Sequence, residues 1–177
     1  MEALVSVSFF PNIVCVDRMF YIKIDKNLSW KGRLFIFTYR NDVRKILIPY
    51  LQNLSPQQWK ANAYHNSISW VIAHIAQTED YWVFQIGLGK ERRLSGENQN
   101  PLEQYLRIRE ETDQVLRSLD AKDLAKLVDV PAFSDGWKPP SEPTMRWLFH
   151  HVYSHETYHA GQIGIIAKLN GFNGPLF

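Results

Sequence analysis

The chain has 177 residues, a formal net charge of +2 and 45% hydrophobic residues, which is typical of one folded domain with its own core. The small charge and the scattered basic residues argue against nucleic acid or a membrane surface as partner. A single cysteine, Cys15, excludes an intrachain disulfide and a cysteine-based zinc site, and it favours a cytoplasmic location.

The first 33 residues differ in pattern from the rest. Residues 5–9 alternate between apolar and polar types, and residues 19–24 are rich in aromatic and β-branched types, which indicates strands, an irregular arm or a poorly ordered extension. We expect no signal peptide, because Glu2 and Pro11 interrupt the apolar start, and no membrane span. The predicted organisation is an N-terminal extension over 1–33 and a helical domain over 34–177.

Two helices are predicted in the first half of this domain. From Leu34 on, apolar residues recur at three- and four-residue steps, at Ile36, Tyr39, Val43, Ile46, Leu47, Tyr50, Leu51 and Leu54. Pro49 should kink this helix or make its last turn irregular. A capped single turn should follow, with Ser55 as N-cap, Pro56 at the first position and Gln58 at the third. The second helix should run from Ser67 to about Ile86, capped by Asn66 or Ser67 and closed by Gly87 and Gly89.

Two more helices are predicted in the second half. Asn100 should cap a helix that begins at Pro101 and has core positions at Leu102, Tyr105, Leu106, Ile108, Val115, Leu116 and Leu119. Residues 120–143 form a long connection with four prolines and the exposed-looking Trp137. The last helix should start near Thr144 and end at Asn170-Gly171. These patterns predict an all-α fold, a four-helix bundle.

Histidines carry the strongest chemical signal. Of six in the chain, four lie within ten residues, at His150, His151, His155 and His159. Residues four apart on a helix differ by about 40° of rotation and about 6 Å of rise, so His155 and His159 can converge on one metal ion. Their stripe also carries core residues, whereas His150 falls about 100° from His151 and should lie outside it.

His74, on the second predicted helix, shares a face with apolar and aromatic residues and should also point inward. Taken alone, it is better explained as a buried histidine with a hydrogen-bond partner than as a metal ligand. Together with the later pair it supplies three ligands for a divalent ion and leaves coordination positions open. His151 is better explained by packing or by support of a ligand, and His65 as a surface or loop residue.

The run from His155 to His159 also fits H-E-x-x-H, the zinc metalloprotease pattern in which Glu156 would be the general base. A protease of this type needs a third ligand downstream. No His, Glu or Asp follows His159, so we regard the protease as a weak alternative.

A wider pattern gives a better match. Residues 68–82, which contain His74, are followed by residues 151–163, which contain the histidine pair and then Gly161 and Gln162. This combination resembles the DinB-like superfamily, which includes the YfiT-like proteins and the bacillithiol transferases. The final-helix signature of the family reads approximately H-x-x-x-H-x-x-x-H-R-G-Q, and here Ala160 replaces the Arg. The resemblance covers residues from about 34 to 171.

The resemblance implies an up-down-down-up four-helix bundle with a three-histidine site for Zn²⁺, Ni²⁺ or a similar ion. Carried over residue by residue, the metal ligands are His74, His155 and His159, and His151 has no ligand role. The implied activity is transfer of a low-molecular-weight thiol to an electrophilic substrate. A metal-dependent hydrolase and a non-catalytic metal-binding stress-response protein remain the alternatives, and no catalytic side chain is assigned.

Three structural hypotheses accompany these expectations. Tyr81, Trp82 and the loop that carries Trp137 could form walls of a pocket beside the metal. The expected partner is a small molecule, not nucleic acid or a membrane. Exposed aromatic residues on the first helix or in the N-terminal segment would allow a homodimer.

Overall fold

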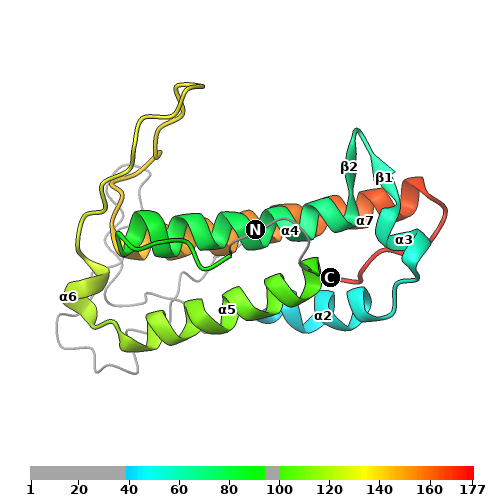
Figure 1. Ribbon diagram of the computed structural model, residues 1–177, viewed down its shortest axis with the longest axis horizontal. Coiled ribbons are helices and arrows are strands. Elements are labelled where there is room, and N and C mark those ends of the chain that lie inside the picture. The colour runs from blue at the N-terminus through cyan, green and yellow to red at the C-terminus, as the bar shows by residue number, and fades with distance from the viewer. Residues whose placement is uncertain (1–38, 95–99) are drawn as a thin grey trace, which may run out of the picture.

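The computed structural model describes residues 39–94 and 100–177, and this part of the chain is mainly helical. The long helical segments are α2 (Asp42–Gln52), α4 (Ile68–Asp80) with its continuation η2 (Tyr81–Gly87), α5 (Pro101–Ser118) and α7 (Met145–Leu169). Figure 1 shows α4 and α7 along one side of the molecule and α5 and α2 along the other. The predicted all-α fold class is confirmed. No helix in the described ranges has the length and apolar character needed to cross a membrane.

The long helices pack against one another in both relative directions, antiparallel and parallel. Trp82 lies beside Trp147, whereas His74, eight residues earlier, lies beside His155, eight residues later, so α4 and α7 are antiparallel. The colours in Figure 1 show that α2 runs in the same direction as α7, and that α5 runs in the same direction as α4. This arrangement brings side chains of α4 and α7 together along the whole length of the pair.

The beginning of the helical domain differs from the sequence expectation. The extension over 1–33 and the boundary at residue 34 lie outside the described residues, and within them α2 starts only at Asp42, after a turn at 39–41. Leu47 and Leu51 are buried as expected. Tyr39 and Ile46 are 69% and 37% exposed, so the buried face of α2 is narrower than its apolar periodicity suggested. Pro49 is accommodated inside α2, three residues before its end.

A capped turn and a hairpin connect α2 to α4. The short helix α3 (Pro56–Lys60) has the predicted capping box, because Ser55 accepts from the Gln58 amide while the Gln58 side chain accepts from the Ser55 amide. A two-stranded antiparallel sheet follows, β1 (Asn62–Ala63) and β2 (Asn66–Ser67). Its turn residues Tyr64 and His65 have φ of 52° and 74°. Positive φ at both positions matches a type I′ hairpin, but such turns normally contain Asn or Gly, which is why no hairpin was predicted here.

The second predicted helix is confirmed with one difference. Ser67 caps α4 through the Trp70 amide, but after Asp80 the helix widens into the π-helical segment η2. The carboxylate of Asp80 is fully buried and accepts hydrogen bonds from the amides of Arg93 and Leu94. This carboxylate therefore fastens the polar loop after η2 back onto the helix.

The second half of the chain follows the predicted helix ends closely. Asn100 caps α5 through the Leu102 amide, and Thr144 caps α7 through the Trp147 amide. Leu106 was predicted to be a core position but is 37% exposed, so that prediction is wrong. The connection over 120–143 contains the one-turn helix α6 (Ala121–Leu124), and its ends are joined by a bridge between Leu127 and Thr144. Figure 1 shows the loop beyond this bridge projecting from one end of the bundle.

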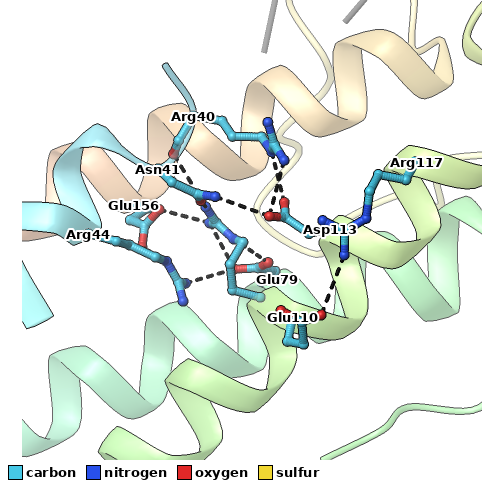
Figure 2. Close-up of polar contacts among 9 residues, drawn as sticks. Arg40, Asn41, Arg44, Glu79, Glu110, Asp113, Arg117 and Glu156 are labelled. Atoms are coloured by element: carbon cyan, nitrogen blue, oxygen red, sulfur yellow. Dashed lines mark hydrogen bonds and ion pairs between the residues drawn. The ribbon is translucent and has the colours of Figure 1, made fainter. Parts of the chain in front are cut away.

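The interior contains a cluster of charges with one member from each long helix. Arg44 of α2 and Arg109 of α5 face Glu79 of α4 and Glu156 of α7, and all four are at most 4% exposed. Arg44 donates to Glu156 at 2.6 Å and to Glu79 at 3.1 Å; Arg109 donates to Glu79 at 2.8 Å and to Glu156 at 2.8 Å. Figure 2 shows Arg44, Glu79 and Glu156 converging from three different helices. Two cations and two anions compensate each other, which makes their burial tolerable and ties the four helices to one another.

Candidate metal centre

Three histidines meet between α4 and α7. The Nε2 atoms of His155 and His159 are 3.0 Å apart, as expected for imidazoles one helical turn apart that point the same way. The ring of His74 lies 5.1 Å from that of His155 and 4.7 Å from that of His159. One potential ligand nitrogen from each of the three lies within 4.8 Å of the others. The structure therefore brings together the three residues that the sequence singled out.

Packing on both sides of α7 fixes the rotation of the two later histidines. Glu156 lies between them in sequence, but its side chain is 1% exposed and points to a different face of α7, into the charge cluster. At the far end of the helix pair, a Cβ added at Gly87 would come within 3.1 Å of Leu148 and Met145, so glycine lets η2 approach α7 closely. These contacts hold α7 at a rotation that leaves His155 and His159 on the side of α4.

The cluster consists of neutral imidazoles. Burial, together with the neighbouring His159, His74 and His151, lowers the pKa of His155 to about 3. Burial, followed by the proximity of His159, also holds the pKa of His74 below its ordinary 6.5, and burial does the same for His159. Described carboxylates take no part in the group. Three neutral nitrogens with free lone pairs suit a borderline divalent ion such as Zn²⁺ or Ni²⁺, so the donor set fits the metal that the family resemblance implies.

Aromatic rings and one amide surround the three histidines. Trp70 stacks on His74 with 4.9 Å between ring centroids and 6° between planes, and it remains 46% exposed. Tyr158 presents its edge to His159 at 5.1 Å. The side chain of Gln162 lies 2.7 Å from Nδ1 of His159. No role was predicted from the sequence for Trp70 or Gln162, although both lie one turn from a histidine.

The remaining histidines lie outside the cluster. His151 stacks on Trp147 at 5.0 Å and meets the edge of Trp82 at 4.7 Å, while its ring is 6.3 Å from that of His155. His151 is therefore a packing residue that separates the three-histidine cluster from an aromatic group. His150 is exposed and lies beside Ser154, and His65 is exposed in the hairpin turn, as the sequence indicated for both.

The aromatic group extends from His151 towards the projecting loop. Trp137 comes from that loop and contacts both Trp82, at 5.9 Å, and His151, at 5.7 Å. Tyr81 reaches the group through Trp82. The three aromatic residues suggested as pocket walls thus lie on the His151 side of the centre, and they are packed against one another and against His151.

Glu156 does not have the surroundings of a metalloprotease base. Its Oε1 accepts from Arg44 at 2.6 Å and from the hydroxyl of Tyr105 at 2.5 Å, and its Oε2 accepts from Arg109 at 2.8 Å. A carboxylate held by three buried donors, with 1% of its surface exposed, has no access to a substrate. The geometry thus removes the support for the H-E-x-x-H interpretation.

Comparison with known families agrees with this centre. The model of the DinB superfamily matches residues 41–163, which is more than half of the chain and includes all three clustered histidines. The chain belongs to the DinB superfamily. No curated protein sequence matches it.

Proposed function

We propose that this DinB-superfamily protein is a metal-dependent enzyme that transfers a low-molecular-weight thiol to an electrophilic substrate. The observation that carries the proposal is the convergence of His74, His155 and His159, with ligand nitrogens within 4.8 Å of one another in a family of metal-binding proteins. Zn²⁺ and Ni²⁺ are the proposed ions, since imidazole suits both. The enzyme would act on a small molecule in the cytoplasm, as a monomer or homodimer.

Three protein ligands favour a catalytic role over a purely structural one. Structural zinc sites are usually closed by four protein ligands, whereas catalytic sites leave a position for water or substrate. Among the described residues, the cluster has three possible ligands, and His74 and His155 are only partly buried. When bound, a divalent ion at such a site supplies Lewis acidity and lowers the pKa of a thiol or of water.

The surrounding residues define what the chain itself contributes. The three histidines would hold the ion, and the half-exposed ring of Trp70 beside His74 offers an apolar surface against which a substrate can lie. Tyr158, 66% exposed, offers a second such ring next to His159. A small molecule that reaches the centre from solvent would thus meet aromatic side chains beside two of the three histidines.

Ala160 gives a specific reason to keep a hydrolase as the second candidate. The family signature has Arg at this position, and here the side chain is a methyl group that is 1% exposed. An anionic thiol therefore lacks that cation, whereas water needs none. A metal-binding stress-response protein without turnover is the third candidate, and it would use the same three histidines.

The test is a matched set of assays on metal-loaded protein. Wild type loaded with Zn²⁺ or Ni²⁺ is mixed with a panel of low-molecular-weight thiols and a chromogenic electrophile, beside His155→Ala and the exposed-site control His150→Ala. Turnover that needs both metal and thiol, is lost in His155→Ala and is kept in the control supports the transferase. Product release without thiol supports the hydrolase. Equal rates in wild type and His155→Ala would overturn both enzyme proposals.

A further inference from the structure

His159 is connected by side-chain contacts to two other residues of α7, Tyr158 and Gln162. Gln162 Oε1 lies 2.7 Å from Nδ1 of His159, and Gln162 Nε2 donates to the hydroxyl of Tyr158 at 3.2 Å. The ring of Tyr158 in turn meets the ring of His159 edge-on at 5.1 Å. Tyr158, His159 and Gln162 therefore form a closed group in which the amide is held at both ends.

The amide contact decides which nitrogen of His159 can bind a metal. A neutral imidazole carries its proton on one nitrogen and a lone pair on the other. When Nδ1 carries the proton and donates it to the Gln162 carbonyl, Nε2 keeps its lone pair and faces His155, 3.0 Å away. When the proton is on Nε2 instead, that nitrogen cannot act as a ligand. The tautomer of His159 therefore determines whether its Nε2 can bind a metal.

We propose that Gln162 is a positioning residue of the metal centre. Its carbonyl oxygen accepts a hydrogen bond from Nδ1–H of His159, so that Nε2 of this histidine is presented to the ion. The inference rests on the proposed metal-binding function and gives it one further residue. Metal-bound histidines usually donate their second ring nitrogen to an oxygen, which fixes the ring orientation and makes the ligand more basic. The side-chain amide of Gln162 supplies that oxygen from the same helix.

The surroundings of Gln162 restrict where its side chain can go. The residue lies between the centre and a cavity of about 160 Å³ beside the β1–β2 hairpin, lined also by Tyr64, Asn66 and Ile165. Tyr158 occupies the amide nitrogen and leaves the carbonyl directed at His159. Residues three positions apart on a helix are neighbours on one face. The position of Gln162 in α7 therefore places its side chain next to His159.

The first experiment measures Zn²⁺ affinity by competition with a chromophoric chelator. Gln162→Leu removes the acceptor and should weaken binding by roughly 10–100-fold, the usual effect of losing the outer partner of a ligating histidine. Gln162→Glu restores an acceptor at the same place and should bind at least as tightly as wild type. Gly161→Glu adds the same charge at the adjacent exposed position, where the side chain meets open space, and should stay within about threefold of wild type.

The second experiment reads the tautomer directly in metal-free protein. Long-range ¹⁵N–¹H NMR should show the proton of His159 on Nδ1 in wild type and Gln162→Glu, and a shift of population towards Nε2 in Gln162→Leu. Thermal unfolding of the metal-free variants shows whether each is folded, because a purely structural role would change the melting temperature without changing the tautomer.

The outcomes separate this inference from the proposed function. Unchanged Zn²⁺ affinity in a folded Gln162→Leu, or an Nε2-protonated His159 in wild type, overturns the role of Gln162 while leaving the three-histidine site intact. A wild type that binds no Zn²⁺ overturns the proposed function, and the tautomer measurement then still decides whether Gln162 sets the protonation of His159.

Discussion

Replacing Glu156 by Gln should destabilise the fold and leave metal binding in place, although Glu156 stands between two of the clustered histidines. The carboxylate accepts charge-assisted hydrogen bonds from Arg44 and Arg109 and a third bond from Tyr105. Its replacement leaves two buried guanidinium groups facing one remaining carboxylate, that of Glu79. The cluster would then hold an uncompensated positive charge in the interior.

The expected loss of unfolding free energy follows from the burial of the ion-pair partners of Glu156. Removing one member of a buried ion pair typically costs about 3–5 kcal/mol, because the other member stays desolvated without its counter-charge. An amide oxygen at position 156 can still accept one bond, so we expect the lower end, about 3 kcal/mol. The matched control is Glu110→Gln, whose ion pair with Arg117 is 3.4 Å long and joins side chains that are 66% and 53% exposed. Such a surface pair contributes less than about 1 kcal/mol.

Urea unfolding of metal-free protein, monitored by circular dichroism, gives the free energies of unfolding of Glu156→Gln and Glu110→Gln relative to wild type. Zn²⁺ titration of folded Glu156→Gln should match wild type, since the carboxylate does not face the metal centre. A loss below about 1 kcal/mol would refute the structural role assigned to the cluster. A fully stable variant with abolished turnover would instead return Glu156 to the chemistry.

Two further predictions concern the last helix and acid stability. Gly161→Ala should raise the free energy of unfolding by about 0.5–1 kcal/mol, because the added Cβ meets open space on a helix. Gly174→Ala should lower it, because its Cβ would lie 2.9 Å from Gly164. Urea unfolding of the two variants measures the sign of each change. Burial favours a raised pKa for Asp113, but hydrogen bonds from Arg40 and Asn41 outweigh it and hold the pKa below its ordinary 3.8. The stabilisation is therefore present above about pH 4 and is lost as the pH falls through the folded-state value, and Asp113→Asn should remove this part of the acid-induced loss.

Local sequence signals predicted much of the fold because their physical causes are local. The capping box at Ser55 and Gln58, the cap at Asn100 and the helix end at Asn170-Gly171 were all confirmed. Each depends on hydrogen bonds within a few residues of the chain. Gly171 has a φ of +78°, the left-handed conformation that such an ending requires.

Features that depend on distant partners were missed. Nothing in the sequence indicates that Arg44, Glu79, Arg109 and Glu156 pair with one another, and only their meeting across four helices explains their burial. The hairpin at Tyr64 was also missed, since nothing in its residue type indicates a positive φ. The widening of α4 into η2 likewise had no identifiable signal.

The candidate site was predictable where its residues lie on one helix. The spacing of His155 and His159 predicted their convergence, and His74 was chosen from its face on a second helix. The role of Glu156 could not be read from H-E-x-x-H, because neighbouring positions on a helix point about 100° apart and the pattern does not say which face holds the partners. The contact between Gln162 and His159 could have been predicted in the same way as the histidine pair, because the two residues are three positions apart on one helix.

The central claim is that three histidines form one metal site, and elemental analysis of purified, Zn²⁺-loaded protein tests it most directly. Wild type and the exposed-site control His150→Ala should each carry about one ion per chain, and His74→Ala, His155→Ala and His159→Ala should each lose it. Full metal content in any one of these three variants, or none in wild type, would contradict the account.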